Sequence, residues 1–210
     1  MAHRFTLAYI GEKNDEFNLA IGVASGRWSH IEAGLCLWFR KITKMPHSTA
    51  RAVFYSVSGF DGRRRMIQAA IGSAKMPEAL RDYVNLLASK AGNYSGSRNK
   101  MAHGDQVFID RPRSKHHGKI ILLEGKETWR VDPQDDAILT LSDIQTMTEN
   151  FRYLAALIAD SVLNWSGDIP RRVAIWSPIV RALPNPAHAQ KLNPTTASQI
   201  RSIESPVVGR

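Results

Sequence analysis

Apolar side chains recur every three or four residues along most of this chain, and that spacing is the period of an amphipathic α-helix. The first such segment runs from Asp15 to about Ile42 and ends before Pro46. Further segments follow near residues 48–70, 77–92 and 142–167. Helices with one apolar face bury that face by packing against one another. The spacing therefore predicts an all-α fold, an up-and-down helical bundle.

Proline, glycine and capping residues indicate where these helices begin and end. A pair of glycines in the second segment predicts a kink or break near Phe60. Pro77 suits the first turn of the third helix, and Gly92 suits its end. Ser142 followed by Gln145 has the spacing of a capping box, which predicts the start of the last long helix.

Between the third and last segments the period changes to that of β-strands. Three short runs, at residues 106–110, 119–123 and 128–131, predict a small antiparallel hairpin or three-stranded meander inserted at about residues 105–132. The first turn of this insertion is strongly basic. It is either a solvated loop or a phosphate-binding finger, and it carries Arg111, Arg113, Lys115, His116, His117 and Lys119.

The length of 210 residues favours one core with appendages. Residues 1–14 are predicted as a lead-in, residues 15–166 as the bundle with its insertion, and residues 167–210 as a proline-containing extension. Its first part, RRVAIWSPIV, has apolar residues that can pack on the bundle. From about Pro184 we expect an irregular, partly disordered tail.

Several classes of protein lose support from what the sequence lacks. Cys36 is the single cysteine, so neither an internal disulfide nor a cysteine zinc site can form, and its apolar neighbours predict a buried, inert thiol. There is no glycine-rich phosphate loop, G-x-S-x-G elbow or His/Glu metal repeat. We therefore expect no metal and no cofactor. No apolar run approaches the length of a membrane span, so the sequence predicts a cytoplasmic protein without a membrane partner.

The net charge of +9 makes an anionic partner plausible, because a basic surface attracts polyanions and releases their counterions. Charge alone does not choose between RNA, DNA and a membrane surface.

The segment Ser97–Gly104, with the sequence SRNKMAHG, concentrates groups suited to phosphodiester chemistry. After a predicted loop at residues 93–97, Ser97 is expected to cap a helix that carries Arg98, Asn99 and His103. On an ideal helix Asn99 and His103 share a face, whereas Arg98 and His103 diverge by about 140°. One copy would hold an incomplete site unless Arg98 lies at a bent helix start, and a two-fold dimer could complete it.

The string RNKMAHG resembles the RNxxxH signature of the HEPN superfamily, all-helical domains that often cleave RNA without a metal. The resemblance implies a homodimer with a composite cleft and a metal-independent endoribonuclease activity. It also implies a toxin or phage-defence role, with an antitoxin or another regulatory protein as a partner.

Elementary chemistry gives each residue of the motif a role in attack by a ribose 2′-hydroxyl on the adjacent phosphate. His103 would transfer protons, because histidine titrates nearest neutral pH. Arg98 would hold the phosphate, and Asn99 would orient His103 or donate to a phosphate oxygen. The expected product is a 2′,3′-cyclic phosphate. Lys100 and the basic turn would contact RNA.

Two further residues could support this site, and two other interpretations stay open. Ser97 would cap the helix, and Glu32, an acid within an apolar stripe, either orients Arg98 or lies in water at the edge of the stripe. A non-catalytic HEPN-like module that binds RNA or a nucleotide, or that dimerises, fits the same sequence. So does a simple surface helix end, with Arg98 solvated and His103 preceding a terminating glycine.

Overall fold

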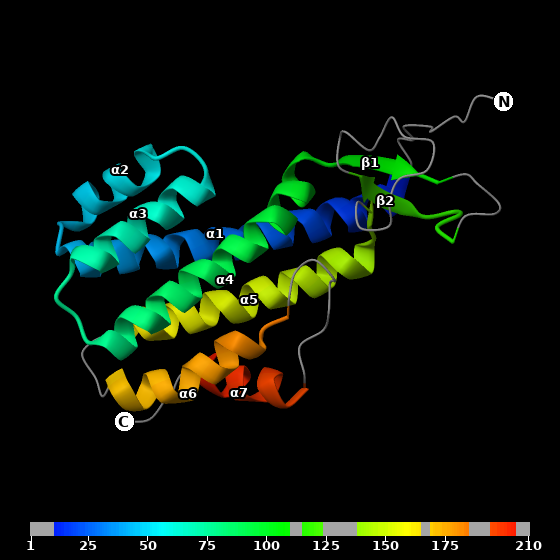
Figure 1. Ribbon diagram of the computed structural model, residues 1–210. Coiled ribbons are helices and arrows are strands. Elements are labelled where there is room, and N and C mark those ends of the chain that lie inside the picture. The colour runs from blue at the N-terminus through cyan, green and yellow to red at the C-terminus, as the bar shows by residue number, and fades with distance from the viewer. Residues whose placement is uncertain (1–10, 110–114, 124–137, 165–168, 185–193, 205–210) are drawn as a thin grey trace, which may run out of the picture.

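The computed structural model describes residues 11–109, 115–123, 138–164, 169–184 and 194–204 (Figure 1). The described chain is an all-α bundle with a small antiparallel sheet, as the hydrophobic spacing predicted. The helices are α1 (Gly11–Thr43), α2 (His47–Ser56), α3 (Phe60–Ser73), α4 (Glu78–His103), α5 (Leu141–Leu163), α6 (Ile169–Ala182) and α7 (Pro194–Glu204). The strands are β1 (Asp105–Phe108), β2 (Ile120–Leu123) and β3 (Ile138–Leu139).

The three longest helices, α1, α4 and α5, form the centre of the bundle (Figure 1). α2 and α3 cover one end of α1, and the sheet lies at the opposite end, where α4 ends and where α1 and α5 begin. Trp28 and Trp38 of α1 are buried, as their helical spacing predicted. The Trp38 indole Nε1 donates a hydrogen bond to the Ser161 hydroxyl of α5 at 3.0 Å, which links α1 to α5 within the core.

A buried glycine permits the close approach of α1 and α5. A Cβ atom at Gly34 would overlap the Ile158 side chain of α5, whereas one at Gly26 on the same helix would meet nothing within 4 Å. Because isoleucine is stiff at χ1, Ile158 cannot turn away without disturbing its neighbours.

Gly34→Ala is therefore expected to lower the free energy of unfolding by about 1–3 kcal/mol through overpacking. Gly26→Ala, the matched control, is expected to raise it by about 0.5–1 kcal/mol, because alanine favours the helix over glycine. Chemical denaturation measures both changes. Shifts of the same sign and size would show that α1 and α5 are not in tight contact at Gly34.

The predicted break near Phe60 is present, and a glycine makes it. α2 ends at Ser56 and α3 begins at Phe60, and Gly59 between them has φ 69°. That left-handed conformation is readily adopted only by glycine. The break lets α2 and α3 fold back on each other beside α1.

The prediction that a helix ends at Gly92 and another begins after Ser97 is wrong. α4 runs without interruption through residues 92–97, and Ser97 is a buried residue within it rather than its N-cap.

The reason is the apolar face that α4 presents to the core. Tyr94 and Met101 are buried, and the Tyr94 ring lies 5.7 Å from that of Phe151 on α5. Each glycine within a helix costs about 1 kcal/mol relative to alanine, whereas burying one large apolar side chain contributes about 1.5–3 kcal/mol. Packing therefore outweighs the local preference of this glycine- and serine-rich stretch.

The capping box of α5 lies two residues earlier than the sequence predicted. Thr140, not Ser142, is the N-cap, and its hydroxyl accepts from the Asp143 amide at 3.3 Å. The Asp143 carboxylate accepts in turn from the Thr140 amide at 2.8 Å. Aspartate thus replaces the glutamate or glutamine usual in this motif.

The predicted hairpin is present and forms the first two strands of the sheet. β1 and β2 are antiparallel, with Asp105 opposite Leu123 and Phe108 opposite Ile120. The third strand is β3 at Ile138–Leu139, which pairs with β2. The run at residues 128–131, predicted as a strand, lies outside the described residues.

The C-terminal extension joins the bundle core, which the sequence did not predict beyond Pro184. α6 packs on α4, α7 packs on α5, and the buried residues of both helices are continuous with the main core. The prediction of an irregular tail is wrong for residues 194–204. Pro194 stands at the first helical position, which proline favours, and Ala197 and Ile200 then face inward, three residues apart.

Candidate functional site

The motif Arg98–His103 forms the last turns of α4, where this helix meets the sheet (Figure 1). β1 follows after a single residue, Gly104. The Gln106 side chain of β1 donates a hydrogen bond to Asn18 of α1 at 2.6 Å. The site therefore lies at the end of the bundle where α1, α4 and β1 come together.

Asn99 and His103 are both exposed and stand one helical turn apart, on the same face of α4. Arg98 is half-buried, and its guanidinium Nη1 donates a hydrogen bond to the Asn99 side-chain oxygen at 3.2 Å. This bond holds the arginine head group beside the face that carries His103.

The regular geometry of α4 removes one of the alternatives for completing the site. The helix is continuous for 26 residues up to His103, so Arg98 does not lie at a bent helix start. Its Cα–Cβ direction therefore diverges from that of His103 by about 140°. The hydrogen bond to Asn99 is the contact that links Arg98 to the face of α4 that carries His103.

Other residues of the motif serve the fold. Ser97 and Met101 are buried on the core side of α4. A Cβ atom at Gly104 would lie 2.7 Å from the Leu122 side chain and 2.8 Å from the Leu123 carbonyl oxygen of β2. Only glycine fits where α4 turns into the sheet. The string SRNKMAHG thus combines structural positions with two exposed polar residues, Asn99 and His103, and the half-buried Arg98.

The described part of the basic turn, residues 115–119, lies at the tip of the β1–β2 hairpin, whereas His103 lies at its base. Backbone hydrogen bonds between Ile109 and residues 118–119 close this tip. Five residues of strand separate it from Gly104, which corresponds to about 17 Å. The structure therefore does not place the turn directly beside the motif. Arg111 and Arg113 lie outside the described residues, Lys115, His117 and Lys119 are exposed, and His116 and Lys100 are half-buried.

Glu32 pairs with Arg63 and not with Arg98, which corrects both alternatives predicted for it. The Arg63 guanidinium lies 3.1 Å from the Glu32 carboxylate, and the two side chains are 17 % and 18 % exposed. Arg63 also donates to the Val57 carbonyl at 3.2 Å and lies over the Tyr55 ring at 5.0 Å. The sequence did not indicate this partner, because Arg63 reaches Glu32 only after the break at Gly59 folds α3 back onto α1.

Cys36 is buried at 7 % exposure, as predicted. Burial raises the pKa of its thiol, although the nearby Arg51 and Arg63 act in the opposite direction. A thiol held in its protonated form is a poor nucleophile, so Cys36 belongs to the core of the fold.

Within the described ranges, no three histidine, cysteine, aspartate or glutamate side chains stand close enough together to hold a metal ion. None of the helices in that part of the chain is both long enough and apolar enough to cross a membrane.

The chain matches no protein-family model, no curated protein and no solved structure.

Proposed function

We propose that this protein is a metal-independent endoribonuclease of HEPN type. The observation that carries the proposal is the exposed placement of Asn99 and His103 one turn apart, with the Arg98 guanidinium bonded to Asn99 at 3.2 Å. Asn99 and His103 thus share one solvent-facing side of α4, and Asn99 links the Arg98 guanidinium to it. The net charge of +9 suits an RNA substrate.

Each group has a distinct task in the cleavage. The 2′-hydroxyl oxygen attacks the adjacent phosphorus while its proton passes to a base, and the bond from phosphorus to the 5′-oxygen breaks as that oxygen gains a proton. His103 carries out proton transfer. Arg98 holds a non-bridging phosphate oxygen and stabilises the added negative charge. Asn99 orients the Arg98 guanidinium and has an amide group left to donate.

A two-fold dimer through α4 would complete the cleft. The solvent-facing stripe of α4 includes Asn93, Gly96, Asn99 and His103. A Cβ atom at Gly96 would meet nothing within 4 Å, so the backbone there is open to close approach by a second helix. In such a pair, Arg98 of one copy can face His103 of the other, which removes the divergence within one helix.

The hairpin tip extends the basic surface away from this cleft. Lys115, His117 and Lys119 are exposed there, and about 17 Å of strand separates them from the motif. An RNA strand has room to bind the tip several nucleotides away from the cleaved bond. We propose that the tip contributes affinity through phosphate contacts and does not contribute to the chemical step.

The proposal is tested by incubating the protein with single-stranded RNA in excess chelator. We expect cleavage that the chelator leaves unchanged, with products ending in 2′,3′-cyclic phosphate, because no step requires a metal. Product ends are identified by mass spectrometry. Products ending in 3′-hydroxyl groups, or activity abolished by the chelator, would contradict the mechanism. Salt-sensitive binding of RNA without cleavage would favour the non-catalytic RNA-binding module.

A further inference from the structure

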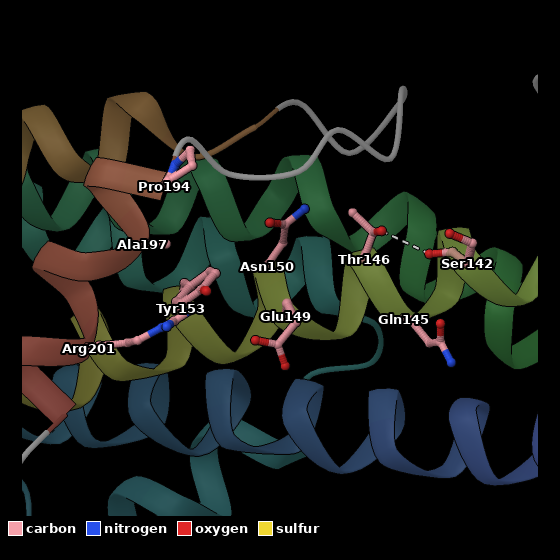
Figure 2. A pocket seen from close by; sticks show the side chains of 9 residues that line it. All are labelled: Ser142, Gln145, Thr146, Glu149, Asn150, Tyr153, Pro194, Ala197 and Arg201. Atoms are coloured by element: carbon pink, nitrogen blue, oxygen red, sulfur yellow. Dashed lines mark hydrogen bonds between the residues drawn. The ribbon is translucent and has the colours of Figure 1, made fainter.

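A second candidate site is a pocket between α5 and α7 (Figure 2). The pocket has a volume of about 400 Å³, which is within the range of small-molecule sites. One wall is a face of α5, and the other is formed by Pro194, Ala197 and Arg201 of α7. Its two walls thus come from segments some 50 residues apart in the sequence.

The α5 wall is polar where a helix covered by another helix is usually apolar. Its residues are three or four positions apart and form one face: Ser142, Gln145, Thr146, Glu149, Asn150 and Tyr153. Asn150 is 2 % exposed and Thr146 is 9 % exposed. Thr146 and Asn150 each already have an interaction within the protein. Hydroxyl and amide groups keep further hydrogen-bonding positions when one is used, so this polar face can also bind a polar ligand.

Opposite charges stand near each other along the pocket. Figure 2 shows the Arg201 side chain reaching from α7 toward Tyr153, with Glu149 one turn earlier on α5. Arg152 donates two hydrogen bonds to Oε2 of Glu149, at 3.1 and 2.9 Å. A carboxylate offers about four acceptor positions, so Glu149 retains capacity to accept from a cationic ligand group.

The uncharged groups between these charges favour an amide-bearing ligand. The Thr146 hydroxyl donates to the Ser142 carbonyl at 2.8 Å, so it presents only acceptor positions to the pocket. The Asn150 amide carries a donor and an acceptor, the same pair that a peptide group carries. A ligand with N–H groups and carbonyl oxygens matches both.

The distance along α5 from Glu149 to Tyr153, toward which Arg201 reaches, indicates how long a ligand that contacts both charges must be (Figure 2). Glu149 and Tyr153 are four residues apart on α5, about 6 Å along the helix axis. An extended peptide spans about 3.3–3.6 Å per residue, so two or three residues bring a terminal ammonium and a terminal carboxylate to that separation or slightly beyond it.

We propose that the α5–α7 pocket binds a short zwitterionic peptide of two or three residues, with its carboxylate at Arg201 and its ammonium group at Glu149. This site is separate from the Arg98–His103 motif, and its occupancy does not depend on RNA cleavage.

The test is a titration of the whole protein with L-alanyl-L-alanine, its N-acetyl derivative and its C-terminal amide, followed by calorimetry or NMR. We expect saturable binding of the dipeptide. Each derivative lacks one terminal charge and is expected to bind roughly fivefold more weakly, the scale of one partly exposed charge pair. Absence of saturable binding up to roughly 10 mM, or equal affinity for all three compounds, would overturn the proposal.

Two variants then assign the charges to residues. In Arg201→Ala the dipeptide and its amide are expected to bind equally, whereas Glu149→Gln should bind the dipeptide and its N-acetyl derivative equally. The exposed Arg181 of α6 and Asp82 of α4 provide the matched controls Arg181→Ala and Asp82→Asn, which should keep the wild-type preferences. If the control variants also lost the preference for the dipeptide over its two derivatives, the dipeptide would not bind in the α5–α7 pocket. Because the three ligands are first compared on the unaltered protein, a variant that loosens α7 does not decide the outcome.

Discussion

Replacement of His103 by alanine is expected to lower the rate of RNA cleavage by about 10²- to 10⁴-fold, the usual contribution of a positioned acid or base. His103 is exposed in the last turn of α4. Its removal is expected to change the free energy of unfolding by no more than about 0.5 kcal/mol, as for most surface substitutions. A cleavage assay with labelled RNA, read beside a denaturation curve, separates the loss of chemistry from a loss of folding.

The matched control is His30→Ala. His30 is also an exposed helical histidine, on α1 and outside the motif. This variant is expected to cleave RNA at the wild-type rate. If both variants retain full activity, the motif is not the catalytic site; if both lose activity equally, the effect is not specific to His103.

Two inactive variants are expected to restore activity to each other when they share a dimer. Arg98→Ala removes the phosphate contact and His103→Ala removes proton transfer. Consider a dimer with one chain of each kind and composite clefts, each built from Arg98 of one copy and His103 of the other. One cleft then contains both substitutions, and the other cleft contains neither. Heterodimers purified through two different tags are therefore expected to show about half of the wild-type activity, because a two-fold dimer contains two equivalent clefts.

A site confined to one chain gives the opposite result. Each cleft of the heterodimer would then lack one group, and activity would stay as low as in either parent. Dimers carrying both tags on Arg98→Ala chains control for effects of the tags and should stay inactive. The experiment thus decides whether Arg98 and His103 act together across two chains or within one.

The long helices were predictable because their signal is local. The apolar spacing of α1 and α5, the proline before α4 and the glycine that separates α2 from α3 each act within a few residues. The hairpin was predictable for the same reason, since its strands adjoin one turn. Errors arose where two local signals competed: Thr140 and Ser142 both suit an N-cap, and the chain uses the first.

The contacts between distant segments were not predictable in this way. Arg63 reaches Glu32 only because α3 folds back onto α1. α7 has few large apolar residues, yet Ala197 and Ile200 are buried on the bundle. The α5–α7 pocket depends on that packing of α7 against α5, so the pocket was not predictable from the sequence.

The sequence by itself determined the helical character of this protein, its inserted hairpin and the chemical content of the Arg98–His103 motif, because residue type and short-range spacing encode all three. Only the tertiary structure decided that Ser97 lies within a continuous α4, that Asn99 and His103 face solvent while Met101 faces the core, and that the basic turn lies at the far tip of the hairpin. The physical reason is burial. Burial of Tyr94 and Met101 against the bundle stabilises α4 by more than the helical conformation of Gly92 and Gly96 costs. That balance depends on residues distant in the sequence.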